Sequence, residues 1–332
     1  MRRPVGATHA VAVALIVGAV GLLVVALAPG PEGEGALRPP PRPTPVPPAL
    51  RPPPTALQSV SPPVIGARVA CAPTGCTVSW ETAAPPVRIL AGPAADRIDR
   101  TAPVAEVDAG SEVTVPGSGV GDRRYFEVVA AGEDRGPVVG DRYLGLEGAP
   151  GARDLGGYTT VDGRRIRWGT LFRSGGLTAV TADDRRRLAS LGLPDDCPPP
   201  DRAARAAPRA PGAVATRAAR TRDARWLRRL ARGSGPAWAH CGAAADRRGW
   251  PTALLLATLG VARETVVADH LLTNRPPPGG AAPTRPVTRA PVDTAFEAVL
   301  RRYGTFARYL DRGLGLDAAT VAALRDRFLA SR

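Results

Sequence analysis

A proline-rich stretch near the start of the chain limits where a folded core can form. Residues 29–63 read PGPEGEGALRPPPRPTPVPPALRPPPTALQSVSPP. Proline has a fixed φ angle and no backbone N–H group, so a segment this rich in proline stays extended and builds neither a helix nor a sheet. We therefore interpret this stretch as a linker between residues 1–28 and the folded part of the chain.

Residues 1–28 combine a basic start with an apolar run. Arg2 and Arg3 precede an uncharged segment, residues 10–28, whose length is near the lower limit for a membrane-spanning helix. This pattern predicts a signal anchor with its basic end in the cytoplasm, so the membrane is an expected partner and all later domains are expected outside the cytoplasm. The predicted location is a bacterial cell membrane, in a single-pass arrangement. The alternative is a cleaved signal and secretion, because the run ends in an A-x-A pattern.

Residues 64–148 contain short segments of β-type character separated by turn residues. Several such segments in about 80 residues predict a small β-sandwich domain. Cys71 and Cys76 flank a turn between two of the segments, where they form either a disulfide across a hairpin or two buried thiols. The expected strands lie within residues 67–72, 76–82, 86–92, 111–117 and 123–132.

The net charge of +14 comes entirely from arginine, since the 44 basic residues include no lysine. This bias indicates genome composition, and the ordinary interpretation is a solvated basic surface; the alternative is attraction to phosphate groups or anionic lipid. We expect no nucleic-acid partner, because no nucleic-acid-binding motif accompanies the charge.

Residues 149–332 have the mixed pattern of an α/β domain. A helix is expected after Thr181, which can cap it, and before Gly192, which can end it. Helical periodicity returns in residues 292–331 with breaks at glycines. Residues 194–236 are an irregular segment rich in Arg, Pro and Ala, in which only residues 221–233 can form a basic helix. A segment translated out of frame would have the same texture.

The stretch from Ala239 to Trp250, AHCGAAADRRGW, has a cysteine and an arginine in a spacing suited to phosphoryl transfer. A strand is expected before it and an apolar helix after it. Small residues between the two let backbone N–H groups converge on an anion at the helix N-terminus, which also favours a thiolate. The spacing alone is weak evidence in a chain so rich in arginine. The small residues are Gly242, Ala243, Ala244 and Ala245.

Three motifs together resemble the bacterial tyrosine-protein phosphatase family. They are GARDLGGY at residues 151–158, GTLFRSGGL at residues 169–177 and HCGAAADRRG at residues 240–249, which corresponds to a family loop of the type HCxAGKDRTG. The resemblance covers about half of the chain. It implies an α/β cysteine-phosphatase-like domain, with a central sheet flanked by helices, that follows the β-sandwich and the N-terminal transmembrane helix.

The resemblance also implies roles for individual residues. Cys241 matches the nucleophile, Arg247 the phosphate clamp, and Asp246 a loop carboxylate that assists protonation or orients Arg247. Arg153 and Asp154 are expected to brace the fold. The implied substrate is a phosphorylated protein or another phosphomonoester, and neither a metal nor a cofactor is expected. The phosphate-binding set is Gly242, Ala243, Ala244, Ala245, Arg247 and Arg248.

The chain departs from the family pattern in the loop and upstream of it. Ala244 and Ala245 replace a glycine and a lysine, and Arg248 replaces a threonine whose hydroxyl could bond the nucleophile's sulfur. No strand ending in a D-L-R-like motif is visible after residue 193. The nearby carboxylates are Asp195, Asp196 and Asp201, and Asp196 is the preferred candidate for the general acid. These departures make the chain a degenerate member. The alternative function is an impaired pseudophosphatase that serves as an envelope interaction or anion-binding protein.

Overall fold

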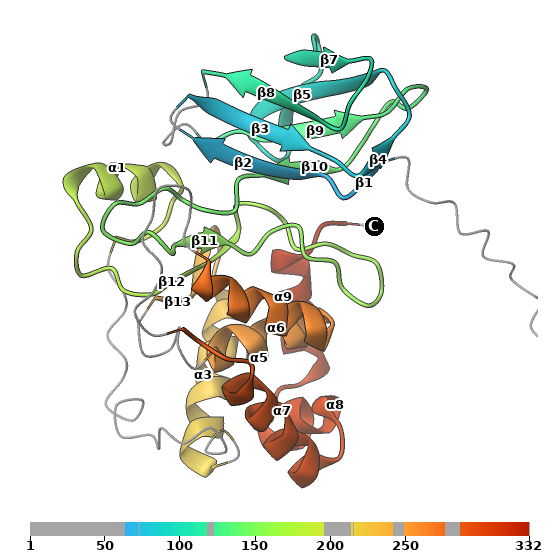
Figure 1. Ribbon diagram of the computed structural model, residues 1–332. Coiled ribbons are helices and arrows are strands. Elements are labelled where there is room, and N and C mark those ends of the chain that lie inside the picture. Colours follow the sequence, from blue (N-terminus) through green and yellow to red (C-terminus); the bar gives the residue numbers. More distant parts are fainter. Residues whose placement is uncertain are drawn as a thin grey trace, which may run out of the picture. The chain divides into compact units, whose positions relative to one another are not determined.

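The computed structural model describes residues 64–72, 74–117, 123–195, 214, 216–241, 249–275 and 286–331. For Thr82, His240 and Cys241 it describes the backbone only. The predicted linker, residues 29–63, and the apolar segment, residues 1–28, lie outside the described residues. Figure 1 shows the arrangement of the strands and helices.

Ten strands lie within residues 64–140 and form antiparallel sheets. One sheet has the order β2-β3-β8, and another has the order β10-β9-β5-β6, with β7 also paired to β5. A further two-stranded pair joins β1 and β4. The bounds are β1 Val64–Ile65, β2 Arg68–Ala72, β3 Gly75–Ser79, β4 Thr82–Ala83, β5 Val87–Ala94, β6 Arg97–Asp99, β7 Ala105–Val107, β8 Glu112–Pro116, β9 Tyr125–Val129 and β10 Val138–Gly140.

Apolar side chains from the two larger sheets share one core. Val78 on β3 and Val115 on β8 belong to the same buried cluster as Ile89 on β5 and Phe126 on β9. From Cys76 to Ser79 the burial of β3 alternates, because successive side chains of a strand point to opposite faces of the sheet.

Cys71 and Cys76 are opposite each other in the antiparallel pairing of β2 with β3. The structure joins them in a disulfide, so the first of the two alternatives for this pair is the one observed.

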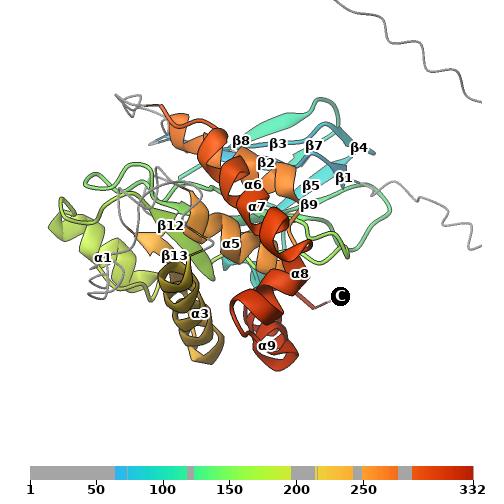
Figure 2. The ribbon, with the colours of Figure 1, turned by 90° about the horizontal axis from the view of Figure 1, so that it is seen from below.

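The rest of the described chain contains a three-stranded sheet and a set of helices. The sheet order is β11-β12-β13, with β12 and β13 parallel. The helices α3 and α9 pack side by side, as Figure 2 shows. The bounds are β11 Arg153–Asp154, β12 Leu171–Ser174, α1 Ala182–Ser190, α3 Arg217–Arg232, β13 Ala237–Cys241, α5 Trp250–Leu259, α6 Arg263–Leu271, η3 Leu272–Asn274, α7 Ala290–Tyr303, α8 Phe306–Arg308, η4 Tyr309–Gly313 and α9 Ala318–Phe328.

The ends of several helices confirm signals that are local in the sequence. Thr181 caps α1 in a capping box with Asp184, and Gly192 follows the helix with a positive φ of 67°. The apolar helix α5 ends at Gly260, which adopts a left-handed φ of 95°. The basic helix expected within residues 221–233 is longer than predicted, because α3 begins at Arg217 after a Thr216 cap.

Helix α5 is the centre of the larger core. Eight of its residues are buried, and Leu254, Leu255 and Leu256 are fully enclosed. A helix that is apolar on all sides must be surrounded by other elements, and β13, α6, α7 and α9 all contact it.

The predicted fold class was wrong in its membrane part. The described residues form a mixed α/β structure with several separate sheets, and none of their helices combines the length and apolar character that crossing a membrane requires. A spanning helix needs about 20 apolar residues. The longest described helix, α3, has 16 residues and is rich in arginine, whereas the apolar α5 has only 10.

The same finding overturns the predicted single-pass location in a bacterial membrane and leaves the expected membrane partner without support. The helix expected within residues 1–28 lies outside the described residues.

Candidate active site

The parallel pairing of β12 with β13 brings two of the sequence motifs together. Arg173 pairs with His240, and Ser174 pairs with Cys241, after a register shift that follows Phe172. All four residues of β12 are buried. The carboxyl ends of parallel strands meet at one sheet edge, which is where α/β folds commonly place their ligands. The LFRS motif and the predicted nucleophile therefore share this edge.

The segment between β13 and α5 is the predicted phosphate-binding loop. The strand ends at Cys241, and the helix begins at Trp250 with Gly249 as its N-cap, so only a short connection joins the two. The predicted site residues of this connection lie outside the described residues, as does the predicted general acid Asp196. These loop residues are Gly242, Ala243, Ala244, Ala245, Asp246, Arg247 and Arg248.

Gly249 has the conformation and the surroundings that only glycine tolerates. Its φ is 69°, in the left-handed region, and an added Cβ would lie 2.5 Å from Nδ1 of His270 and 2.9 Å from Cγ2 of Val292. Both the backbone angle and the close neighbours exclude a side chain here. The last glycine of the HCGAAADRRG motif thus sets the direction in which the chain enters α5.

Pro251 occupies an early position of α5 that a proline accepts. The first N–H groups of a helix have no intrahelical acceptor, so the missing N–H group costs nothing there.

A buried charge network connects β11, β12 and α6. The carboxylate of Asp269 accepts hydrogen bonds from Nη1 of Arg173 at 2.5 Å, Nε of Arg153 at 3.2 Å and the hydroxyl of Tyr158 at 2.9 Å. Arg153, Arg173 and Asp269 are at most 1% exposed. Burial by itself would raise the pKa of Asp269, but the two guanidinium groups hold this pKa well below its ordinary value. The carboxylate therefore stays charged and holds both arginines.

This network explains why the RDLGGY and LFRS motifs occur together. Arg153 begins the first motif and Arg173 belongs to the second, and Asp269 lies 116 and 96 residues away from them in sequence. The bracing role expected of Arg153 is therefore observed. Arg173, Ser174 and Asp269 were absent from the site predicted from sequence. The LFRS motif was the sequence signal for Arg173 and Ser174. No local sequence pattern indicates that Asp269 belongs to the site.

Asp154 braces a neighbouring turn. Its carboxylate accepts hydrogen bonds from the backbone N–H groups of Gly156 at 2.7 Å and Gly169 at 2.8 Å, and from Nη2 of Arg123 at 2.6 Å. Burial raises the pKa of Asp154, and the charge of Arg123 opposes that shift. This residue fixes the backbone that leads into β12.

Trp250, the first residue of α5, is held in place by a hydrogen bond to a residue of α3. The indole Nε1 of Trp250 donates a hydrogen bond to Asp223 at 3.0 Å, and Arg222 forms an ion pair with the same carboxyl group at 2.7 Å. Burial raises the pKa of Asp223 against the opposing effect of Arg222. Asp223 lies within residues 194–236, which the sequence predicted to be largely irregular. It nevertheless contacts Trp250, the first helical residue after the predicted loop.

Among the described residues, no group of three or more His, Cys, Asp or Glu side chains is placed to hold a metal ion.

Comparison with known proteins agrees with the motifs. The model of the tyrosine phosphatase family matches residues 144–197 and 200–330. A curated relative from Cupriavidus necator, named "Putative tyrosine-protein phosphatase H16_A0669", is 29% identical over 250 residues. That alignment covers 58% of this chain and 90% of the relative.

The family match spans more than half of the chain and includes β11, β12, β13, α5 and the Asp269 network. The chain therefore belongs to the tyrosine phosphatase family and is a phosphatase, a phosphoric monoester hydrolase.

Proposed function

We propose that the chain hydrolyses phosphomonoesters, such as phosphotyrosine in a protein, through a cysteinyl-phosphate intermediate on Cys241. The observation that supports this most is that β13 ends at Cys241 and α5 begins at Trp250, a short distance along the chain. Cys241 ends the strand at the sheet edge next to Ser174, and a helix N-terminus follows the loop. This order of elements suits anion binding, because N–H groups at a helix start have no other partner.

The proposed first step transfers the phosphoryl group to the enzyme. The Cys241 thiolate attacks phosphorus and forms an S–P bond while the bond to the leaving alcohol oxygen breaks. Backbone N–H groups of residues 242–248 and the guanidinium of Arg247 stabilise the charge on the phosphoryl oxygens. A proton passes to the leaving oxygen from a carboxylic acid, for which Asp196 is the candidate, with Asp246 in an assisting role.

The second step releases inorganic phosphate. Water attacks phosphorus, the S–P bond breaks, and the thiolate is restored while the water proton returns to the carboxylate. The sheet edge supports the site in this step. The Asp269 network holds Arg173 in position, and therefore also the end of β12.

A pseudophosphatase is the second candidate. The replacements at Ala244, Ala245 and Arg248 favour it, because they remove a flexible glycine, a cation and a hydroxyl from the family loop. Such a protein would retain anion binding at the loop without turnover.

The test is hydrolysis of p-nitrophenyl phosphate by the full chain and by Cys241→Ser and Arg247→Ala variants. Arg232→Ala, at the exposed end of α3, is the matched arginine control. We expect turnover in the wild type and in the control. Loss of one catalytic group of this kind costs at least about 100-fold in rate.

Acid quenching during turnover provides an independent readout. A phosphorylated protein that is absent from Cys241→Ser supports the covalent intermediate. A folded wild-type chain that binds orthophosphate but is no faster than Cys241→Ser supports the pseudophosphatase and contradicts the hydrolase.

A further inference from the structure

The β-sandwich contacts the phosphatase part of the chain at the turn that leads into β12. The match to the tyrosine phosphatase family begins at residue 144, so the strands β1 to β10 all precede it. Trp168, just before β12, donates a hydrogen bond from its indole Nε1 to the backbone oxygen of Val138 on β10 at 3.0 Å. Its ring also meets Tyr125 on β9 edge to face, with 6.4 Å between the ring centres. The sandwich therefore touches the segment that runs into the strand beside Cys241.

Arg123 joins the sandwich to two strands of the phosphatase sheet. It lies two residues before Tyr125, and its side chain is 12% exposed. Its Nη2 donates a hydrogen bond to the carboxylate of Asp154 on β11 at 2.6 Å, and its Nε donates to the Tyr125 hydroxyl at 2.7 Å. The guanidinium also lies over the ring of Phe172 on β12, 5.9 Å from the ring centre. One side chain from outside the family match thus contacts both β11 and β12.

The contact with Asp154 extends to the backbone ahead of β12. The same carboxylate accepts hydrogen bonds from the N–H groups of Gly156 and Gly169, and β12 begins two residues after Gly169. Asp154 is fully buried, and a buried carboxylate stays charged when a cation is held against it. Arg123 supplies that cation, so it maintains the acceptor that fixes Gly169.

We propose that Arg123 is a positioning residue for the phosphatase site, and that the β-sandwich is therefore a functional part of the enzyme. Arg123 acts through Asp154 and Phe172, which fix the path of β12. That path in turn decides where Ser174, at the end of β12, lies beside Cys241. This inference rests on the proposed hydrolysis at Cys241 and extends it to residues outside the family match.

The competing explanation is that the sandwich is an independent module and that Arg123 contributes only to stability. Under that explanation, loss of Arg123 lowers the free energy of unfolding but leaves turnover by the folded protein unchanged. Arg100 is the matched control for this point. It pairs at 2.8 Å with Glu127, which is as fully buried as Asp154, but both partners belong to the sandwich.

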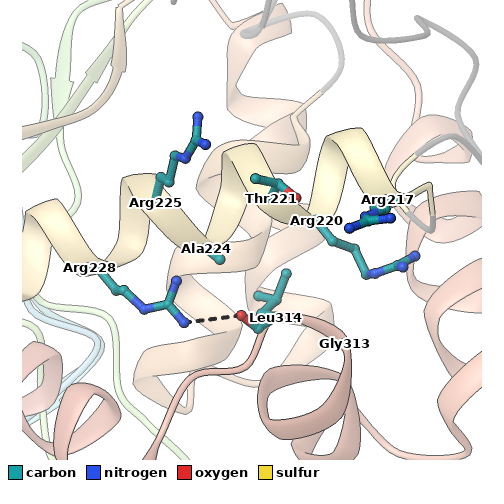
Figure 3. A pocket seen from close by; sticks show the side chains of 8 residues that line it. All are labelled: Arg217, Arg220, Thr221, Ala224, Arg225, Arg228, Gly313 and Leu314. Atoms are coloured by element: carbon teal, nitrogen blue, oxygen red, sulfur yellow. Dashed lines mark hydrogen bonds between the residues drawn. The ribbon is translucent and has the colours of Figure 1, made fainter. Parts of the chain in front are cut away.

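Arg228 is a second control, because it also joins two elements of the fold. It lines a pocket between α3 and the end of η4, where its Nη2 donates a hydrogen bond to the backbone oxygen of Leu314 at 3.4 Å, as Figure 3 shows. Its loss removes a bracing arginine within the family-matched residues and leaves the contact between the sandwich and β12 in place.

The experiment measures kcat and KM of the full chain for p-nitrophenyl phosphate, at a temperature where circular dichroism shows each variant to be folded. We expect Arg123→Gln to lower kcat at least about tenfold, because a small misplacement of a site by a distant residue costs up to about 100-fold in rate. Arg100→Gln and Arg228→Gln should keep kcat within about threefold of the wild type, because their partners belong to other elements.

Two further variants keep the test informative if Arg123→Gln does not fold. Arg123→Gln/Asp154→Asn removes both partners and leaves no unpaired buried charge. Its kcat should lie within about threefold of that of Arg123→Gln, because both changes interrupt the same contact. Arg123→Lys keeps the charge but not the paired N–H groups of the guanidinium, and its kcat should lie between those of Arg123→Gln and the wild type.

Hydrogen exchange of the β12 amides, followed by mass spectrometry, provides a readout that does not depend on turnover. Leu171–Ser174 should exchange faster in Arg123→Gln, or in the double variant, than in the wild type and the two controls. A wild-type chain without turnover contradicts the proposed hydrolysis, and the Kd of orthophosphate then replaces kcat with the same expected order of variants. Unchanged exchange in β12 overturns the positioning role of Arg123. Wild-type kcat in a folded Arg123→Gln or in the double variant, or an equal loss of kcat in Arg100→Gln, also overturns it.

Discussion

Ser174 is the parallel-sheet partner of Cys241, and its hydroxyl is buried without a hydrogen-bond partner among the described residues. Its side chain is 1% exposed. A buried hydroxyl without a partner costs free energy, so its position at the carboxyl edge of the sheet, next to the proposed nucleophile, calls for a functional reason. The family threonine that could bond the sulfur is replaced here by Arg248.

If the Ser174 hydroxyl donates a hydrogen bond to the Cys241 thiolate, Ser174→Ala removes that bond. We expect this change to lower kcat/KM for p-nitrophenyl phosphate by about tenfold or more, since a hydrogen bond to a charged group contributes roughly 1.5–3 kcal/mol. The free energy of unfolding should stay within about 1 kcal/mol of the wild type, because the Ser174 hydroxyl forms no hydrogen bond with the described part of the chain. Ser174→Thr keeps the hydroxyl and should retain most of the activity. Full activity in the alanine variant would assign Ser174 to packing alone.

Asp269→Asn should destabilise the protein by about 3–5 kcal/mol, because it removes the buried negative charge that pairs with the buried guanidinium groups of Arg153 and Arg173. Asp293→Asn is the matched control, since Asp293 also pairs with two arginines, Arg263 and Arg289, but in a partly exposed position. That change should cost no more than about 1 kcal/mol. Urea unfolding of the three proteins at neutral pH measures both values, and equal losses would show that burial does not matter.

The stability of the protein should depend on pH in the direction that follows from the lowered pKa of Asp269. Its pKa in the folded state is below the ordinary value, so its stabilising effect is complete above the unfolded pKa of about 3.9 and is lost as pH falls through the folded pKa. The stability gap between the wild type and Asp269→Asn should therefore be constant near neutral pH and shrink below about pH 4.

The contribution of Asp223 to stability should depend on pH in the opposite direction. Burial raises its pKa, so its contribution is complete below the unfolded pKa and is lost as pH rises through the folded pKa. Relative to Asp223→Asn, which keeps an acceptor for the Trp250 N–H group, the wild type should lose stability as pH rises from about 4. Unfolding curves of both proteins across this pH range test the sign, and a gap that runs the other way would contradict it.

Gly249→Ala should cost about 3 kcal/mol or more and lower activity. The change combines a strained left-handed backbone, at about 1–2 kcal/mol, with overlap against His270 and Val292. Gly163→Ala is the control, because its φ of 83° has the same strain with nothing within 4 Å of the added Cβ. Thermal unfolding should show a larger loss of stability for Gly249→Ala than for Gly163→Ala. An equal loss of stability in both would show that the crowding at Gly249 has no effect.

The Cys71–Cys76 disulfide closes a loop with a sequence separation of 5. Constraint of a loop this short in the unfolded chain is worth about 2 kcal/mol. Cys71→Ser/Cys76→Ser should lose about this much in the free energy of unfolding and keep kcat unchanged, because the bridge joins β2 to β3 far in sequence from Cys241. A loss of activity at temperatures where the variant is folded would connect the strands β2 and β3 to catalysis.

Much of the local structure could be predicted because its causes lie within about ten residues of each other. The Thr181 capping box, the apolar run that Gly260 ends and the strands around Cys71 and Cys76 are all encoded in short patterns. The three motifs also indicated the family, and the family match over residues 144–197 and 200–330 confirmed it.

The tertiary structure decided which of these distant residues meet. No periodicity shows that Arg153 and Arg173 share Asp269, or that Ser174 pairs with Cys241, since each contact joins separate elements of the chain. The apolar run near the start predicted a membrane helix from composition alone, whereas the described helices are short and packed within the fold. Local propensity acts through neighbours in sequence, but the site depends on packing that only the folded chain brings about.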